Sequence, residues 1–577
     1  MCGITAYSGK KQASEILFES LRRLEYRGYD SAGIATSNGK GLTVKKAVGQ
    51  VDEIQRNIDL KTMDGNLGVG HTRWATHGNV SKENAHPHTC CNKRFAVVHN
   101  GIVENWESLR EKLTGCSFKS QTDSEVIAHY IEKKSRDLGV ERAIQDFMEK
   151  AKGSFAVTLM DAEKDNLFAI KNGSPLAIGL NDNEIFVGSD VFAFSSHTDQ
   201  AIFLGDYEYA RIEGSDLVVK NIDGEKLEKK PRKVDWDRKE SQKDGFDHYM
   251  HKEIFEIPEA IERLKKSLET EQRDRLKRFS KKVKKSKKII FTASGTSYHA
   301  SLLGVYFLQR AGIEAQTLIA SEFKNYERVD SETLLIPISQ SGETRDVLEA
   351  IEYSLERGAE VASITNVPHS TVERKSDVNL RIRAGQEVCV AATKTFTNQL
   401  YTLLKIAEEL NGKVLKDNMS KTVEDIIEKN EPQVKKIAKE LKDDGDIYII
   451  GKEEAYPVAR EIALKLKEIA YVHAEGMMGG ELKHGTLALI ENDTPVISLI
   501  PKKESEIVSN VKEVEARGAR TIELSPFYGD FYIPEEANGS FAFLSAVIGF
   551  LLTYWIGRER GRPIDRPRNL AKSLTVK

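Results

Sequence analysis

The stretch LLIPISQSGETRDVLEAI, residues 334–351, joins a short apolar run to a hydroxyl-rich loop and then to a helical pattern. A short apolar run bounded by such a loop predicts a buried strand. The loop then opens a helix, where free backbone N–H groups and the helix dipole favour an anion. It lacks the lysine of a nucleotide-binding P-loop, so it predicts a phosphate cradle of another kind. Its polar side chains are those of Ser339, Gln340, Ser341 and Thr344.

The strand–loop–helix pattern occurs twice at a constant spacing. KIIFTASGTSYHASLLGVYFL begins one unit at residue 288, and IYIIGKEEAYPVAREIALKL begins another at residue 447. An offset of 160 residues aligns Ile289 with Ile449, Val347 with Ile507 and Gly358 with Gly518. A constant offset over gapless stretches indicates a duplication. Because strands alternate with helices in both copies, we expect two doubly wound α/β units with parallel sheets.

The two copies differ at their loops. In the first unit the loop ASGTSYHA, residues 293–300, also joins a strand to a helix and carries the hydroxyls of Thr296 and Ser297. In the second unit Leu499 and Pro501 stand where the first has two serines of SQSGET. Ordinary strand–helix turns are the alternative, but a hydroxyl-rich loop in one copy alone favours a phosphate site.

The second unit carries a cluster of ionisable residues instead. Lys465 and Glu468 are three residues apart, so they share a helix face. A surface ion pair is the alternative, but the surrounding stretch is largely apolar, which favours burial. His484 follows in ELKHG, and Lys572 lies in a C-terminal tail without a fold-building pattern.

Residues 1 to about 225 have a different organisation. Short β-rich segments alternate with turn signals, and two helical patterns, SEILFESLRRLEYRG and SEVIAHYIEKKSRDLG, interrupt them. This pattern predicts an α+β layer domain. A polar, lysine-rich stretch from about 219 to 245 predicts a linker, after which helical periodicity resumes.

Cys2 directly follows the initiator methionine. Once Met1 is removed, its thiol, with a pKa of about 8.5, stands beside an α-amine with a pKa of about 8. Proton transfer between them costs only about 0.7 kcal/mol, so an N-terminal cysteine can carry its own general base. The alternative is that a small second residue simply permits removal of the methionine.

Other residues of this half suit the same chemistry. Arg73 in HTRWATHG can grip a carboxylate with its guanidinium group. Asn100 and Gly101 stand at a turn after an apolar strand, and a side-chain amide with a backbone N–H can form an oxyanion hole. Asp123 begins a helical pattern, where a plain N-cap is the alternative.

The composition of the chain excludes several classes of protein. With 577 residues, 40% hydrophobic and 30% charged, the chain is typical of a globular protein of several domains. A net charge of −3 gives no field for nucleic acid or anionic lipid. Five irregularly spaced cysteines and no visible signal peptide predict the cytoplasm.

Three local stretches are interpreted as structural. The apolar run at 541–556 is short for a membrane span and predicts a buried helix. The basic run at 275–288 lacks interleaved aromatic residues and predicts a solvated helix face. HPHTCC, residues 86–91, has metal-binding residue types at too close a spacing, so we expect no metal.

The motifs of the first half resemble the class II, N-terminal-nucleophile (Ntn) glutamine amidotransferase family. The resemblance implies an α+β Ntn sandwich in which Cys2 attacks the glutamine amide and forms a γ-glutamyl thioester. It assigns the oxyanion to Asn100 and Gly101, and a gate for the released ammonia to Trp74. The glutamine-binding residues that it implies are Arg73, Trp74, Thr76, His77 and Asp123.

The second half resembles the sugar isomerase (SIS) family, and SQSGET is fairly specific for a sugar-phosphate site. Nearly the whole chain is similar to the glucosamine-6-phosphate synthase family, the isomerizing glutamine:fructose-6-phosphate amidotransferases. The motifs LRRLEYRGYDSAG, HTRWATHG, SQSGET, ATKTF, ELKHG and PRNLAKS stand in the family's order. Ser294, Ala392 and Thr486 depart from residues common in the family.

The resemblance implies roles in the second half. Lys572 forms a Schiff base with the ketose, Glu468 moves the proton between C1 and C2, His484 assists ring opening and Lys465 supports proton handling. The implied sugar-phosphate residues are Thr296, Ser297, Ser339, Gln340, Ser341, Thr344, Val390 and Ala391.

The expected activity is conversion of fructose 6-phosphate and glutamine to glucosamine 6-phosphate and glutamate, the first step towards UDP-N-acetylglucosamine. We expect no cofactor, metal, nucleic acid or membrane to take part. We expect the protein to form a homodimer. The expected domains are 2–225 (glutaminase), 226–280 (linker and docking helices), 281–425 and 440–565 (SIS units) and 566–577 (active-site tail).

Two rival functions remain open. An SIS deaminase or isomerase could run the sugar reaction backward with an idle front half, although the set of Cys2, Arg73, Asn100 and Asp123 argues against it. A non-catalytic sugar-phosphate sensor would have no use for Glu468. Phosphoribosyl-transferring and asparagine-synthesising relatives are excluded because their diphosphosugar and nucleotide loops are not in the sequence.

Overall fold

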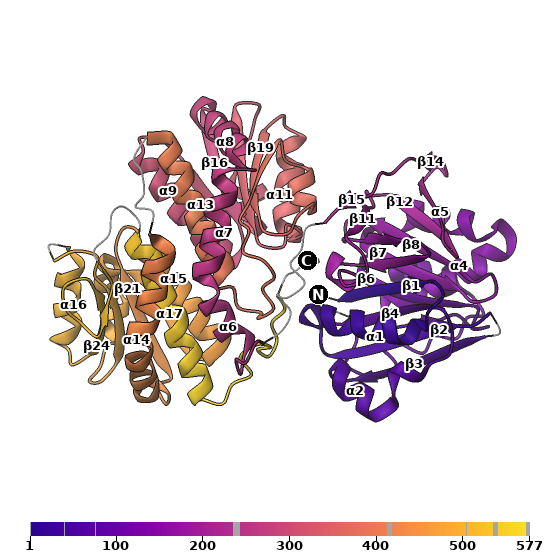
Figure 1. Cartoon of the computed structure of the whole chain (residues 1–577), viewed down its shortest axis with the longest axis horizontal. Helices are drawn as coiled ribbons and strands as arrows, with labels where there is room; N and C mark the ends of the chain where they lie inside the picture. The colour runs from indigo at the N-terminus through magenta and orange to yellow at the C-terminus, as the bar shows by residue number, and fades with distance from the viewer. Residues whose placement is uncertain are drawn as a thin grey trace. The chain divides into compact units, whose positions relative to one another are not determined.

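The chain is described here by a computed structural model that covers residues 2–39, 41–75, 77–234, 243–411, 418–503, 505–534 and 540–572. It divides into two compact units, which are described separately. Unit 1 comprises residues 1–241 with 571–577, and unit 2 comprises residues 242–570. Figure 1 labels many of the helices and strands of each unit.

Unit 1 contains two antiparallel sheets. The first is built from β1 (Gly3–Ser8), β2 (Ser31–Ser37), β3 (Leu42–Val48), β4 (Leu67–Arg73), β9 (Ala177–Asn181), β10 (Glu184–Gly188), β11 (Gln200–Phe203) and β15 (Arg232–Lys233). The second is built from β5 (His88–Thr89), β6 (Phe95–Val103), β7 (Gly153–Asp161), β8 (Asn166–Asn172), β12 (Glu208–Glu213), β13 (Asp216–Asn221) and β14 (Lys226–Leu227). Their strand orders are β15-β11-β9-β10-β1-β4-β2-β3 and β14-β13-β12-β8-β7-β6-β5.

The sheets pack face to face between two layers of helices. The helices are α1 (Ala13–Leu24), α2 (Val51–Ile58), α3 (Trp106–Glu111), α4 (Asp123–Leu138) and α5 (Val140–Lys150). Alternate residues of β1 face opposite sides, as in any strand: Ile4 joins the core between the sheets and Tyr7 the core beneath α1. Helices α4 and α5 cover the second sheet. The predicted α+β sandwich is confirmed as four layers, helix–sheet–sheet–helix.

The stretch expected as a linker begins inside unit 1. Residues 216–221 form β13, and the short strands β14 and β15 add to the edges of the two sheets. Short, lysine-rich strands are typical of sheet edges, which is why the sequence of this stretch resembles that of a linker. Residues 235–242 lie outside the described residues.

Unit 2 contains two parallel five-stranded sheets. The first has β16 (Lys288–Ala293), β17 (Gln316–Ile319), β18 (Thr333–Ser339), β19 (Glu360–Thr365) and β20 (Val378–Arg381). The second has β21 (Asp446–Gly451), β22 (His473–Met478), β23 (Pro495–Leu499), β24 (Arg520–Ser525) and β25 (Phe531–Tyr532). Their orders, β17-β16-β18-β19-β20 and β22-β21-β23-β24-β25, are equivalent. The predicted duplication is confirmed, since the offset of 160 residues places β19 on β24.

Helices cover both sheets. The first copy carries α9 (Gly295–Arg310), α10 (Phe323–Tyr326), α11 (Arg345–Leu355), α12 (Thr371–Arg374) and α13 (Lys394–Asn411). The second carries α15 (Ala455–Lys465), continued by a π-helical turn (Leu466–Ala470), and α16 (Ile507–Glu515). The remaining helices are α6 (Tyr249–Phe255), α7 (Ile257–Glu269), α8 (Arg273–Lys285), α14 (Met419–Leu441) and α17 (Ser540–Glu559).

Helix α17 is the one helix in the described chain that is long and apolar enough to cross a membrane. Its residues from Ser540 to Gly557 are buried inside unit 2, where the helix packs against α14 and α15. The prediction of a buried core helix is therefore confirmed. One continuous apolar core, to which α17 contributes, joins the two copies.

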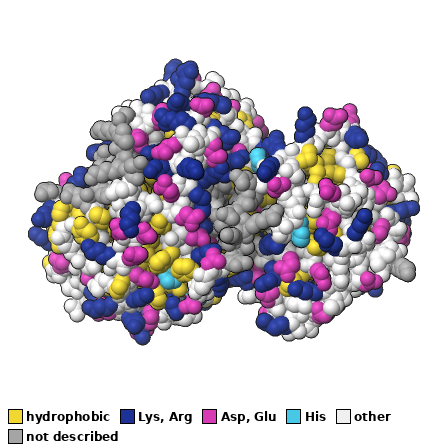
Figure 2. Space-filling view, in the orientation of Figure 1, with side chains coloured by type: hydrophobic (Ala, Val, Ile, Leu, Met, Phe, Trp, Pro, Cys, Tyr) yellow, Lys and Arg dark blue, Asp and Glu magenta, His cyan; other side chains and the backbone are white. Residues whose placement is uncertain are grey.

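The surface carries both signs of charge. On the face drawn in Figure 2, Lys and Arg are interspersed with Asp and Glu on each unit, and exposed hydrophobic residues are scattered. This pattern agrees with the small net charge of −3.

Candidate active sites

Cys2 lies directly before β1. Its Sγ accepts a hydrogen bond from the backbone N–H of Trp74 at 3.2 Å, because β1 pairs with β4 and Trp74 follows β4. Burial raises the pKa of the Cys2 thiol, and the Trp74 N–H partly offsets this effect. A thiol held in this way needs a nearby base before it can act as a nucleophile.

Asn100 and Gly101 reach Cys2 from β6, in the facing sheet. Asn100 Nδ2 donates to the backbone carbonyl of Cys2 at 2.9 Å, and its Oδ1 lies 3.0 Å from Nε2 of His71. These contacts fix the amide group beside the cysteine. Gly101 has a φ of +120°, and a Cβ there would lie 2.0 Å from the carbonyl oxygen of Ser154, so only glycine fits.

Arg73 ends β4 and organises the segment that follows. Its guanidinium donates to the carbonyls of His77 and Asn79, the latter at 3.1 Å. Burial lowers the pKa of Arg73, and the nearby carboxylates, including that of Asp123, oppose this shift. Thr76 lies outside the described residues.

Asp123 is the first residue of α4 and is buried. Thr122 occupies the N-cap position, while Asp123 Oδ2 accepts the backbone N–H of Val103 at 2.8 Å. The alternative that Asp123 caps the helix is therefore excluded. Its carboxylate instead fixes the start of α4 to the end of β6, the strand that carries Asn100.

Three loops of the first α/β copy meet at one edge of its sheet. Thr296 and Ser297 lie in the first turn of α9, which follows β16. Ser339 ends β18, and the loop after it carries Gln340, Ser341 and Thr344. Val390 and Ala391 lie in the loop after β20. Because these strands belong to one parallel sheet, their carboxyl ends share an edge. Ligands of open α/β sheets bind at this edge.

Hydrogen bonds and one close contact fix the conformation of the SQSGET loop. Ser339 Oγ accepts the N–H of Gly342 at 3.0 Å and lies 3.2 Å from Thr344 Oγ1. Gly342 has a φ of +64°, and a Cβ there would lie 2.1 Å from Oγ of Ser370. The local fold thus holds these hydroxyls at the start of α11, as a phosphate cradle requires.

Lys465 is fully buried between the two α/β copies. Its Nζ contacts Glu468 Oε2 at 2.6 Å and Glu461 Oε1 at 3.3 Å, and it donates to Thr296 Oγ1 at 2.9 Å. Burial alone would lower the pKa of Lys465, but the two carboxylates outweigh it and raise this pKa. Lys465 is buried and Glu468 is half-buried, so this geometry supports the interpretation that the two do not form a surface ion pair.

Glu461 and His299 were missed by sequence reasoning. Glu461 is fully buried; its Oε1 accepts from Thr296 Oγ1 at 2.9 Å, and its Oε2 lies 2.7 Å from His299 Nδ1. The signal was present, since Glu461, Lys465 and Glu468 share one face of an otherwise apolar helix. The network links α9 of one copy to α15 of the other.

Two further predicted residues come from other segments of the chain. His484 is exposed at the end of the 3-10 helix Gly479–His484. Lys572 follows a tail that is anchored in unit 2: the carbonyl of Asp565 accepts the N–H of Val390 at 3.2 Å, and Arg568 N–H donates to Tyr471 Oη at 2.6 Å. The tail therefore contacts the Val390 loop and the residue that follows the π-helical turn of Glu468.

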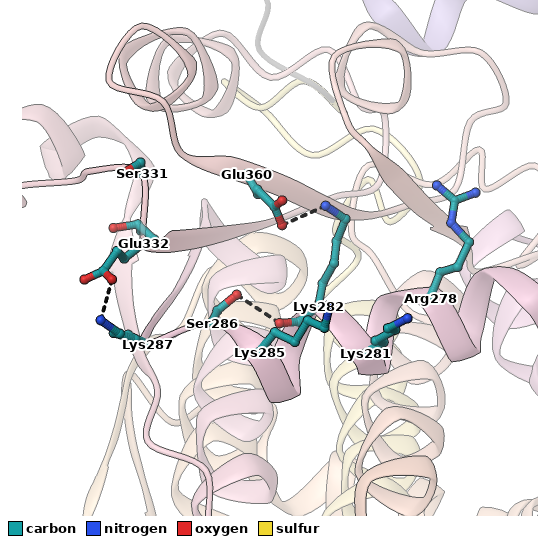
Figure 3. A pocket seen from close by; sticks show the side chains of 10 residues that line it. Arg278, Lys281, Lys282, Lys285, Ser286, Lys287, Ser331, Glu332 and Glu360 are labelled. Carbon is teal, nitrogen blue, oxygen red and sulfur yellow. Dashed lines mark hydrogen bonds and ion pairs between the residues drawn. The ribbon is translucent and has the colours of Figure 1, made fainter.

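The basic run forms the exposed face of α8, as predicted. Its other face buries Leu276, Phe279 and Val283. Its cations line a hollow of about 540 Å³ with Glu332 and Glu360 (Figure 3), which pair with Lys287 and Lys282. Because these acidic residues stand at the amino ends of β18 and β19, the hollow lies at the sheet edge opposite the phosphate loops.

Comparisons with known proteins support both units. A glutamine amidotransferase domain model matches residues 71–213, and an SIS domain model matches residues 282–408 and 440–531. The glutamine–fructose-6-phosphate aminotransferases [isomerizing] of Thermococcus kodakarensis and Pyrococcus horikoshii are each 41% identical to this chain, with 100% of both chains covered. The C-terminal domain of glucosamine-fructose-6-phosphate aminotransferase from Francisella tularensis is 33% identical, with a TM-score of 0.51, and covers 57% of this chain and 100% of its own.

The fold and the two sites thus define an amidotransferase in which a glutaminase half is fused to a duplicated sugar-phosphate isomerase half. An N-terminal cysteine site and a phosphate-loop edge occupy the two halves. The chain belongs to the glutamine–fructose-6-phosphate aminotransferase (isomerizing) family.

Proposed function

We propose that this chain converts fructose 6-phosphate and glutamine to glucosamine 6-phosphate and glutamate in the cytoplasm. The observation that carries the proposal is the assembled Cys2 site, with Asn100 bonded to Cys2 itself, in a chain that also builds a phosphate-loop edge. Neither a backward-running sugar enzyme nor a sugar-phosphate sensor needs the Cys2 site.

In the glutaminase half, removal of Met1 frees the α-amine of Cys2 to accept the thiol proton. The sulfur attacks the glutamine amide carbon, the C–N bond breaks and ammonia leaves. Water then hydrolyses the γ-glutamyl thioester to glutamate. We assign the oxyanion to Asn100 and Gly101 and the amino-acid head group to Arg73, Trp74, Thr76, His77 and Asp123.

In the isomerase half, the hydroxyls of the loops after β16 and β18 bind the sugar phosphate together with the Val390 loop. Lys572 forms a Schiff base with the ketose, and water leaves. Ammonia from the glutaminase half then adds to this imine carbon and displaces the lysine amine, so the nitrogen stays on C2. The four residues after Arg568, of which Lys572 is the last, extend at most about 14 Å. Glu468 transfers the proton between C1 and C2, while Lys465, bonded to Glu468 at 2.6 Å, holds that carboxylate in position.

The position of His484 bears on the quaternary structure. His484 is exposed and lies apart from the Lys465 network of its own chain, as far as the described residues extend. We propose that the protein is a homodimer in which sites use residues from both chains, with His484 assisting ring opening. No cofactor takes part, since the ketone itself acidifies the neighbouring C–H bond.

Nitrogen-source dependence tests the proposal. Cys2→Ala should abolish formation of glucosamine 6-phosphate from glutamine while retaining its formation from added ammonia, because only the first half needs the thiol. Glu468→Gln should abolish both. Product formation from glutamine at the wild-type rate in Cys2→Ala, or from ammonia in Glu468→Gln, would contradict the proposal. Intact-mass measurement establishes whether Met1 has been removed.

A further inference from the structure

Among the described residues, Cys91, Cys116 and His129 bring their ligand atoms within 4.8 Å of one another. Cys91 lies in the turn between β5 and β6, Cys116 follows α3, and His129 lies on α4. Three separate segments of unit 1 therefore meet at one point. Cys91 is exposed, Cys116 half-buried and His129 buried, so the group is open to solvent on one side.

The spacing matches the edges of a zinc tetrahedron. With Zn–S bonds of about 2.3 Å and Zn–N bonds of about 2.0 Å, tetrahedral angles place sulfur roughly 3.5 Å from nitrogen and roughly 3.8 Å from a second sulfur. Cys91 Sγ lies 3.6 Å from Nδ1 of His129. Small side-chain rotations would bring Cys116 to the same distance.

The second nitrogen of His129 faces a carboxylate. Nε2 lies 3.6 Å from Oε1 of Glu125, one helical turn earlier on α4. A carboxylate beside Nε2 favours the tautomer with the proton on that nitrogen, which leaves the Nδ1 lone pair facing the thiols. Metal-binding histidines have this arrangement.

We propose that Cys91, Cys116 and His129 bind a zinc ion, with solvent in the fourth position. Thiolate and imidazole ligands select a borderline-soft cation of this kind. The two thiols lose their protons and bind as thiolates, and no group is oxidised or reduced.

The HPHTCC motif did not reveal this site because its histidines point elsewhere. The His86 ring packs against that of His71 at a tilt, with centroids 4.0 Å apart, and edge-to-face against that of His88 at 4.6 Å. Of the motif, Cys91 alone joins the cluster, and its partners come from segments far along the chain. A Cys2His set assembled across a fold in this way has no local spacing signature.

The ion would brace the segment that leads to Asp123. Glu125 also accepts the backbone N–H groups of Lys119 and Ser120, at 2.9 and 2.6 Å. A metal bridge from Cys116 to His129 would close the same segment onto α4 from its other end. The ion would therefore stabilise this segment, and its ligands do not include Cys2.

Metal content and cobalt substitution test the site in the full-length protein. A Cys2→Ala background removes the other reactive thiol of this unit. After reduction and loading with zinc, we expect one tightly bound ion per chain. Replacement by Co²⁺ should give thiolate-to-cobalt charge-transfer absorption and the intense visible bands of a tetrahedral centre.

Matched variants distinguish this site from general thiol binding. Cys91→Ser and Cys116→Ser should lose the ion, and Glu125→Gln should weaken it roughly 10- to 100-fold. Cys90→Ser is the control, because the Cys90 thiol bonds to Asn92 and the Phe95 N–H and lies outside the cluster. Cys91 is exposed, so its serine variant keeps the fold. Three results would overturn the proposal. The first is a protein without a stoichiometric ion, and the second is a cobalt signal that is unchanged in Cys91→Ser. The third is a Cys91–Cys116 disulfide whose thiols, once reduced, bind no cobalt.

Discussion

At Gly101 the backbone of β6 passes so close to β7 that no side chain fits. The left-handed φ of +120° and the 2.0 Å gap to the Ser154 carbonyl act together. Elsewhere in the same unit, Gly115 has a φ of +84°, and a Cβ added there would meet no atom of the described residues within 4 Å. Gly115 therefore carries the backbone constraint without the clash. The two glycines separate conformational strain from steric exclusion.

Gly101→Ala should therefore cost more than about 3 kcal/mol of unfolding free energy, because overpacking against a backbone atom adds to the strain of a positive φ. Gly115→Ala should cost about 1–2 kcal/mol, the strain alone. Urea denaturation of both variants measures the difference. Equal destabilisation by the two substitutions would show that the close approach at Gly101 is relieved at no cost.

Glu461 shows how a residue outside the predicted set can hold elements together. It links α9 to α15 through buried bonds to Thr296, His299 and Lys465. The same two regions also share an exposed bond, from Tyr306 Oη to Glu453 Oε2 at 3.2 Å. Burial distinguishes the two links: a buried charge without its partner is costly, whereas an exposed one is solvated.

At the scale of these elements, Glu461→Gln should destabilise unit 2 by about 3 kcal/mol, because it leaves buried Lys465 with Glu468 as its remaining carboxylate. Glu453→Gln should change stability by less than about 0.5 kcal/mol. Thermal unfolding of the two variants is the measurement. A loss in Glu453→Gln as large as that in Glu461→Gln would contradict the ranking by burial.

At the scale of the whole molecule, unit 1 buries a group of histidines. Burial lowers the pKa values of His71, His86, His88 and His99, that of His71 to about 3. The ordinary histidine value is about 6.5. As the pH falls below that value, the unfolded chain takes up protons before the folded one does. The stability from these groups is therefore fully present above about pH 6.5 and is lost progressively towards pH 3.

Unit 1 should accordingly lose stability between pH 6.5 and pH 4, at up to about 1.4 kcal/mol per pH unit for each histidine. Urea denaturation of wild type across this range measures the slope. His86→Met should make the slope shallower by about one proton, since His86 is buried like the others and its ring contacts those of both His71 and His88. An unchanged slope in that variant would show that His86 is already protonated in the fold.

Much of the architecture could be predicted because it repeats or alternates locally. The offset of 160 residues, the strand–loop–helix pattern around Ser339 and the buried helix α17 all have signals within a few residues of each other. The roles of the individual site residues stay predictions. The structure adds that Asn100 contacts Cys2, that Lys465 pairs with Glu468 and that Asp123 is not a cap.

The amino-acid sequence by itself determined the two fold classes and the duplication, because periodicity is a property of neighbouring residues. Tertiary structure alone decided which distant side chains meet. Glu461 with His299, and Cys91 with Cys116 and His129, become neighbours only when separate segments pack together. Burial then sets the charge state of the groups that meet, and no sequence spacing carries that information.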